Sequence, residues 1–222
     1  MITSGNAQAV NFREIRMGNI APGMLYRSSH PVKDNKQEKT ISMLANNARI
    51  AAVVNLCDTT SSVYTKAIFA PWYNALLKNG RVLALGMDFS VTSENFNRKL
   101  KEGLEFVIKT DGPWLIHCYA GVDRTGFVSM VLESFMGAPL DDVINDYLLS
   151  FTSVYESSIY ETNRADSQVA MQVLSVMGGS MAINGQNLQH IAEIYLQKKI
   201  GLSAVETELL KAKLAKNSNL RA

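Results

Sequence analysis

The fold is decided by one stretch of the chain, His117-Cys118-Tyr119-Ala120-Gly121-Val122-Asp123-Arg124-Thr125-Gly126. The apolar run 113–116 directly before it is typical of a buried strand. Residues 124–136 are apolar on nearly every side, which predicts a buried helix that ends at Gly137. We therefore expect a strand–loop–helix junction, where backbone N–H groups and a helix N-terminus attract an anion.

Two side chains of this stretch carry the predicted chemistry. Cys118 ends a strand and faces a helix N-terminus and a guanidinium, so we expect it to be a thiolate and a nucleophile. Arg124 follows after five intervening residues and offers a planar fork that suits two phosphate oxygens. Together they predict covalent catalysis on a tetrahedral anion, and phosphate fits this description.

The neighbouring residues have supporting roles. Thr125 can donate a hydrogen bond to the cysteine sulfur, and His117 is expected to bind the loop backbone and hold it rigid. Gly121 tolerates the φ angle that the loop needs, and Gly126 allows the helix to pack closely against the loop. The remaining members of the predicted phosphate-binding loop are Tyr119, Ala120, Val122 and Asp123.

This stretch resembles the catalytic loop of the protein tyrosine phosphatase superfamily, and its Ala-Gly-x-Asp-Arg-Thr-Gly ending is similar to the bacterial tyrosine, dual-specificity and lipid phosphatase branch. Segments 11–14, 22–29, 146–150 and 200–203 also resemble that branch. The resemblance implies a tyrosine-phosphatase-like α/β fold and hydrolysis of phosphomonoesters through a cysteinyl-phosphate. It implies no metal and no organic cofactor.

Other interpretations of the cysteine are a buried structural residue, a zinc ligand and a rhodanese-type sulfur transferase. Zinc ligands come in sets, whereas His117 and Cys118 are neighbours on opposite faces of a strand. Rhodanese-type loops usually lack the Arg-Thr-Gly ending. A phosphate-binding pseudophosphatase and a sulfur- or arsenate-handling enzyme stay open as alternatives.

The chain has 222 residues, of which 47% are hydrophobic, and this predicts a single domain over 1–222. Alternating helices and strands indicate α/β architecture with a central, mostly parallel sheet flanked by helices. Besides 113–116, we expect strands at 49–56 and 81–87. Helices are expected at 34–47, 62–78 with a break at Pro71, 93–110, 140–151, 166–177, 186–199 and 203–216.

The last part of the chain, residues 152–222, is predicted to be a helical extension with extra C-terminal helices. Its segment 152–185 combines tyrosines and methionines with glycines, and such residues suit a lid over the site. Ordinary helix packing is the alternative, because methionine at helical spacing usually belongs to a core.

A phosphatase needs an acid for the leaving oxygen and a base for water. We place Asp88 first, because it follows the expected strand 81–87 and precedes Cys118 by 30 residues. That spacing is similar to the mobile acid loop of dual-specificity phosphatases. Asp58, at the end of the expected strand 49–56, and Asp123, beside Arg124, are the alternatives. Each of the three is otherwise an ordinary turn or capping aspartate.

Two further residues have predicted roles near the loop. The sequence Asn55-Leu56-Cys57 resembles the strand end of phosphatase-and-tensin-type enzymes, where a second cysteine can form a disulfide with the nucleophile. This resemblance makes Cys57 a redox candidate, and a small buried apolar residue is the alternative. Arg27 is expected either to brace the loop through Asp123 or to form a structural ion pair.

The substrate prediction depends on the variable loop positions Tyr119, Ala120 and Val122, none of which is basic. Phosphoinositide-preferring relatives tend to place lysines there, so we expect a protein tyrosine phosphatase that acts on a phosphotyrosyl protein or a small phosphomonoester. A phosphoinositide or inositol-phosphate phosphatase is the alternative, with basic residues from elsewhere in the fold supplying the charge.

Charge and hydropathy exclude several classes of partner. The chain has 22 basic and 20 acidic residues, and a net charge of +2 makes no case for nucleic-acid binding. No stretch approaches the roughly 18 apolar residues of a membrane span. Residues 1–6 lack the basic and apolar regions of a signal peptide, so the cytoplasm is the expected location, with secretion as an effector left open.

Overall fold

The computed structural model describes residues 4–154 and 164–215 of the chain. A five-stranded sheet with the order β1-β2-β5-β3-β4 lies at its centre. Among the described strands, β1 pairs antiparallel with β2 and the other three pairings are parallel, which confirms the predicted α/β class. The strands are β1 (Arg13–Glu14), β2 (Leu25–Ser28), β3 (Ala52–Asn55), β4 (Val82–Ala84) and β5 (Trp114–His117).

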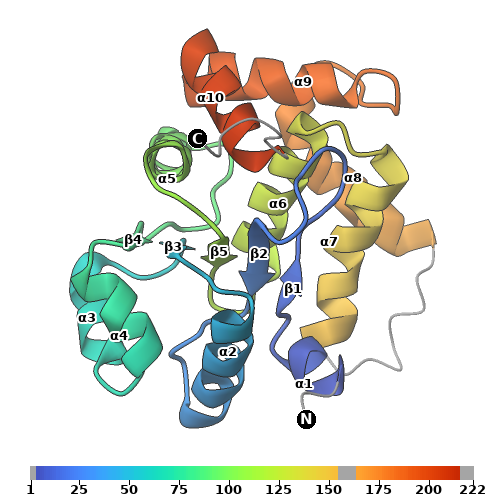
Figure 1. Cartoon of the computed structure of the whole chain (residues 1–222). Helices are drawn as coiled ribbons and strands as arrows, with labels where there is room; N and C mark the ends of the chain where they lie inside the picture. Colours follow the sequence, from blue (N-terminus) through green and yellow to red (C-terminus); the bar gives the residue numbers. More distant parts are fainter. Residues whose placement is uncertain (1–3, 155–163, 216–222) are drawn as a thin grey trace.

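Helices cover both faces of the sheet (Figure 1). One face packs against α2, α3 and α4, and the other packs against α5, α6 and the C-terminal helices. The described helices are α1 (Ser4–Ala9), α2 (Asn35–Asn47), α3 (Thr60–Ala67), α4 (Pro71–Lys78), α5 (Glu94–Lys109), α6 (Asp123–Phe135), α7 (Leu140–Val154), α8 (Arg164–Gly178), α9 (Leu188–Ile194), the π-helix η1 (Tyr195–Ile200) and α10 (Ala204–Leu214).

Strand β5 is buried along its whole length, and its side chains alternate between the two faces of the sheet. Trp114 and Ile116 pack in the core on the α5–α6 side, and Leu115 packs on the α2–α4 side. Cys118, the next residue after the strand, belongs to the α5–α6 core. His117 contacts Tyr73 of α4, so the two residues lie on opposite faces, as their adjacency in a strand predicts.

Several predicted helix boundaries are confirmed, because local signals determine them. Asp34 caps α2 by accepting from two backbone N–H groups, and the Ser93 hydroxyl caps α5 by accepting from the N–H of Phe96. Pro71 begins α4 and so interrupts the expected helix 62–78. Gly137 follows α6 with φ at +79°, which is a conformation that favours glycine at a helix C-terminus.

The strands differ from the predicted strands more than the helices differ from the predicted helices. Strands β1 and β2 are not predicted from the sequence, because they are short and contain the polar residues Arg13 and Arg27. The prediction of a strand over 81–87 is wrong in its length, because β4 ends at Ala84. Gly86 adopts a φ of +54° and turns the chain away from the extended conformation. Asp88 therefore lies on a loop rather than directly at the end of a strand.

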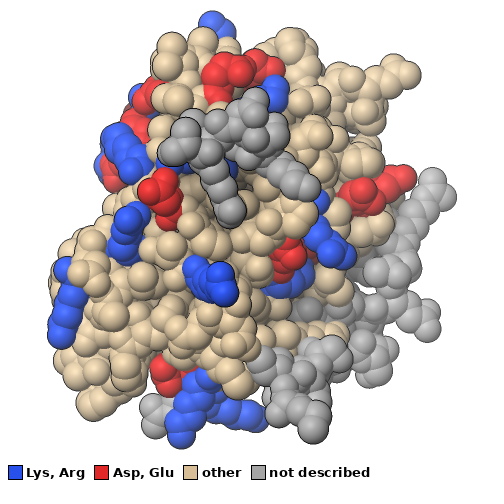
Figure 2. Space-filling model, viewed as in Figure 1, with Lys and Arg blue, Asp and Glu red and all other residues tan. Residues whose placement is uncertain are grey.

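The C-terminal part of the described chain is helical, as predicted. Helix α8 buries Ala170, Leu174 and Met177 in the core on the α6 side. This packing fits the ordinary-helix alternative for that part of the predicted lid, and residues 155–163 lie outside the described residues. None of the described helices has both the length and the apolar character needed to cross a bilayer. Basic and acidic side chains are interspersed over the face shown in Figure 2.

Candidate active site

The residues 118–124, called the 118–124 loop below, connect β5 to α6 as the sequence predicts. Cys118 is 2% exposed and lies at the base of the loop. Gly121 has φ at +74°, and a Cβ atom there would lie 2.5 Å from the carbonyl oxygen of Ser28. Glycine is therefore required at this position both by conformation and by close approach.

The backbone of the 118–124 loop has the polarity of an anion site. Among the residues that the structure describes, none accepts a hydrogen bond from the N–H groups of residues 119–124. The Gly121 carbonyl instead accepts two bonds from outside the loop, from Arg27 Nη2 at 2.8 Å and from Asn11 Nδ2 at 3.0 Å. Unpaired N–H groups next to the N-terminus of α6 attract a negative charge.

Arg27 braces this loop by a route that differs from the expected one. Its guanidinium is fully buried, donates to the Gly121 carbonyl and pairs with Asp146 of α7. Asp123 is exposed in the first turn of α6, and within residues 4–154 and 164–215 it forms no hydrogen bond with Arg27. The expected bridge through Asp123 is therefore wrong, because the Gly121 carbonyl takes its place. The alternative of a structural ion pair is confirmed by the buried pair with Asp146.

Arg124 connects the 118–124 loop to the loop that bears Asp88. Arg124 Nη1 donates to the carbonyl oxygen of Met87 at 2.6 Å. Asp88 is the next residue, and its exposed carboxylate accepts from the backbone N–H of Ser90 at 3.2 Å. Asp88 thus directly follows Met87, whose carbonyl oxygen binds Arg124, the predicted phosphate-binding residue.

Thr125 and His117 lie against the loop in different ways. The Thr125 hydroxyl is buried and has no hydrogen-bond partner among the described residues, so the expected bond to Cys118 is not formed in this structure. His117 Nδ1 lies 3.3 Å from the Cys118 carbonyl oxygen, and Nε2 lies 2.9 Å from the Tyr73 hydroxyl. Burial, together with the charge of His30, lowers the pKa of His117 well below its usual value. We therefore describe His117 as neutral.

Asp58 is surrounded by donors. Its carboxylate accepts from His30 Nε2 at 2.7 Å, Lys66 Nζ at 2.5 Å, Asn55 Nδ2 at 3.0 Å and Ser62 Oγ at 3.1 Å. Burial alone would raise the pKa of Asp58, but the hydrogen bonds from His30, Lys66 and Asn55 outweigh it and hold the pKa well below its usual range. A carboxylate that stays ionised in this way has no proton to donate to a leaving group.

Cys57 is partly buried beside this cluster, and both it and Cys118 are free thiols. Burial raises the pKa of Cys57 to about 12, and the charges of Asp58 and Cys118 add to the effect. The ligand atoms of His30, Cys57 and Asp58 all lie within 4.8 Å of one another, so these three side chains could hold a metal ion. Such a cation would compete with the Lys66 ammonium for Asp58.

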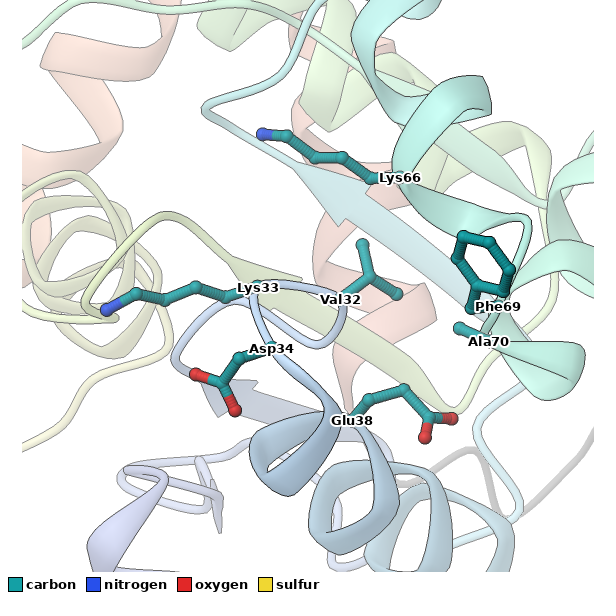
Figure 3. Close-up of a pocket in the computed structure, with 7 residues that line it drawn as sticks. All are labelled: Val32, Lys33, Asp34, Glu38, Lys66, Phe69 and Ala70. Atoms are coloured by element: carbon teal, nitrogen blue, oxygen red, sulfur yellow. The ribbon is translucent and has the colours of Figure 1, made fainter.

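One lysine lies against the 118–124 loop and also lines a pocket. Lys33 Nζ lies 4.4 Å from the ring centroid of Tyr119, which is 54% exposed. Lys66 pairs with Asp58, whereas Lys33 forms no ion pair with an acid among the described residues. Figure 3 shows the neighbouring pocket, which is lined by Val32, Lys33, Asp34, Glu38, Lys66, Phe69 and Ala70.

Comparison with known proteins gives the family. A model of the tyrosine phosphatase family matches residues 6–216, which is nearly the whole chain. This chain belongs to the tyrosine phosphatase family. The bacterial branch within it stays a prediction, as do dual specificity and the cytoplasmic location.

Two solved structures are similar to this tyrosine phosphatase family member. The core catalytic domain of the PP-IP phosphatase Siw14 from S. cerevisiae, in complex with citrate, is 18% identical, and the match covers 86% of this chain and 93% of that chain with a TM-score of 0.45. A second structure of the Siw14 catalytic core is 17% identical, with coverage of 83% and 90% and a TM-score of 0.45. No curated protein sequence matches this chain.

The sequence did not reveal all members of the site of this family member. Asn11, Tyr73 and Asp146 contact the 118–124 loop or its bracing residues from distant parts of the chain. His30, to which the sequence assigns no role, is buried against Asp58. The segments that contain Asn11 and Asp146 resemble the bacterial branch, and that resemblance is the available signal for both.

Proposed function

We propose that this chain is a cysteine-dependent phosphomonoester hydrolase that acts through a cysteinyl-phosphate on Cys118. The observation that carries the proposal is the row of N–H groups at residues 119–124, which have no partner among the described residues and lie between the buried Cys118 and the first turn of α6. Arg124 closes the ring with a guanidinium that suits the equatorial oxygens of a transferring phosphoryl group.

Asp88 is our candidate for the general acid and base. The contact between Arg124 and the Met87 carbonyl supports it, since it brings the Asp88 loop to the 118–124 loop. Asp58 is disfavoured because four donors hold it ionised. Asp123 is exposed in the first turn of α6, directly before Arg124, and stays the alternative.

The reaction then has two steps. In the first, the Cys118 thiolate attacks phosphorus in line, the S–P bond forms, the ester P–O bond breaks and Asp88 gives its proton to the leaving oxygen. In the second, Asp88 takes a proton from water, the new P–O bond forms and the S–P bond breaks. The thiolate is restored and inorganic phosphate leaves.

For the substrate, we place a small, multiply phosphorylated ester such as an inositol phosphate ahead of phosphotyrosine. The observation that favours it is Lys33, which brings to the loop rim the positive charge that Tyr119, Ala120 and Val122 lack. Lys66 lines the same pocket, but its ammonium is paired with Asp58, so Lys33 is the residue that supports this substrate class. A phosphotyrosyl protein is the second candidate, because the loop interior itself contains no lysine.

The test is turnover of an aryl phosphate by the full chain. Wild type should release phosphate and be inhibited by vanadate, and Cys118→Ser should abolish turnover. Cys57→Ser is the matched control, because it replaces the second cysteine and should keep activity. Binding of phosphate without turnover in wild type would instead identify a pseudophosphatase, and turnover of thiosulfate or arsenate would identify the sulfur- or arsenate-handling alternative.

A further inference from the structure

The Gly121–Val122 peptide is held in one orientation from outside the 118–124 loop. Arg27 Nη2 and Asn11 Nδ2 both bind the Gly121 carbonyl oxygen, at 2.8 and 3.0 Å. In a planar trans peptide, the carbonyl of one residue and the N–H of the next point in opposite directions. A carbonyl that is fixed on the outer side therefore directs the N–H of Val122 toward the inner side, where the phosphate would bind.

Arg27 is itself immobilised by helix α7. Its side chain is fully buried, Nη1 lies 2.5 Å from Asp146 Oδ2 and Nη2 lies 2.8 Å from Ser150 Oγ. Arg13 binds the same two residues. Its Nε lies 2.7 Å from the other carboxylate oxygen of Asp146, Oδ1, and its Nη2 lies 2.9 Å from Ser150 Oγ. A planar guanidinium can satisfy three acceptors in fixed directions at once, whereas a lysine ammonium on a flexible stem cannot.

Arg13, Arg27 and Asp146 also place charged groups on the outer side of the 118–124 loop. Glu133 of α6 is buried near these groups, and burial, with the charge of Asp146, raises the pKa of Glu133 well above its usual value. The two guanidinium groups of Arg13 and Arg27 pair with the single carboxylate of Asp146, and burial acts against a second negative charge on Glu133. The resulting positive charge lies on the outer side of the 118–124 loop and favours an anion on its inner side.

We infer that Arg27 is a positioning residue of the phosphate site, which orients the Gly121–Val122 peptide and is itself held by Asp146 and Ser150 of α7. The inference rests on the proposed function, because the peptide matters only if a phosphate binds in the loop. It goes beyond that function by making a residue that touches neither substrate nor sulfur responsible for the strength of anion binding.

The experiment measures inorganic phosphate binding and turnover in Arg27→Lys. Loss of one well-aligned N–H donor should weaken phosphate binding about tenfold and lower kcat, with the enzyme still folded. The specific readout is the amide signal of Val122 in a ¹H–¹⁵N spectrum. Phosphate should shift this signal in wild type, and the shift should shrink in Arg27→Lys.

Leu210→Ala is the control for stability alone, since Leu210 is fully buried in α10 away from the loop. It should lower Tm and leave phosphate binding unchanged. If Arg27→Lys does not fold, Ser150→Ala removes one acceptor of Arg27 and should weaken phosphate binding in the same direction by a smaller factor.

The two ways of failing are distinguishable. Wild-type phosphate affinity and a wild-type Val122 shift in folded Arg27→Lys, or in folded Ser150→Ala if it must be used, would overturn the inference and leave the proposed function intact. Full turnover in Cys118→Ser would overturn the proposed function, whatever Arg27→Lys does.

Discussion

Arg124 donates through Nη1 to the carbonyl oxygen of Met87 at 2.6 Å, and this bond joins two loops that are 37 residues apart in the chain. One loop contains Cys118, the proposed nucleophile, and the other contains Asp88. The same guanidinium that would bind phosphate thus also touches the segment that would supply the acid. In the proposed mechanism, binding of an anion and placement of the acid would therefore be linked through Arg124.

Replacement of Asp88 tests the assignment of the acid. Asp88→Asn should lower kcat by about 10²- to 10⁴-fold on an alkyl phosphate, because a poor leaving group depends on protonation. The loss should be much smaller on p-nitrophenyl phosphate, whose leaving group needs little help. Asp123→Asn is the matched control, and a leaving-group dependence seen in that variant rather than in Asp88→Asn would move the role to Asp123.

Replacement of Lys33 tests the substrate class. Lys33→Ala should raise KM for inositol hexakisphosphate about threefold, in line with one exposed charge contact, and leave KM for p-nitrophenyl phosphate unchanged. The difference should vanish in high salt because exposed charges are screened. Lys36→Ala, an exposed lysine of α2, is the control. A wild-type KM for inositol hexakisphosphate in Lys33→Ala would favour phosphotyrosine instead.

Oxidation tests the role of Cys57. Peroxide should convert the Cys118 thiolate to a sulfenic acid, and the Cys57 thiol should then displace water to form a disulfide that mass spectrometry detects. Since the pKa of Cys57 is about 12, its thiolate fraction and the rate of disulfide formation should rise about tenfold for each pH unit between 7 and 9. Absence of a Cys57–Cys118 peptide after peroxide treatment removes the redox role.

The environment of Asp58 predicts how stability depends on pH. The pKa of Asp58 is lowered in the folded state, so its stabilising effect is present above its unfolded pKa of about 3.9 and is lost as pH falls below that value. Asp58→Asn should therefore reduce the free energy of unfolding by about 2 kcal/mol at pH 7. Urea unfolding should show this difference shrinking below about pH 4, and a constant difference down to pH 3 would contradict it.

Local signals explain which parts of the fold were predictable. Asp34, Ser93 and Pro71 act on the backbone within three residues, so the helix starts that they predict are found in the structure. Gly86 also acts locally, but its positive φ cannot be distinguished in sequence from an ordinary strand glycine. Strands β1 and β2 owe their existence to pairing with each other and with β5 rather than to their own composition.

The residues of the candidate site also differ in how far they could be predicted from local sequence. The 118–124 loop is contiguous, so its cysteine, arginine and glycine were readable as one motif. The partners of that loop are separated from it by long stretches of chain, as with Arg27 and the Gly121 carbonyl, which are 94 residues apart. A sequence indicates that a buried arginine needs acceptors, but it does not indicate that one of them is a backbone carbonyl.

Strand β5 lies in the interior of the sheet, hydrogen-bonded to β2 on one side and to β3 on the other. The strand that delivers Cys118 therefore cannot separate from its neighbours by fraying at an edge. Its amide protons should exchange with solvent only when the whole molecule unfolds. The proposed nucleophile is thus attached to the part of this protein that opens last, while Asp88 lies on an exposed loop outside the sheet.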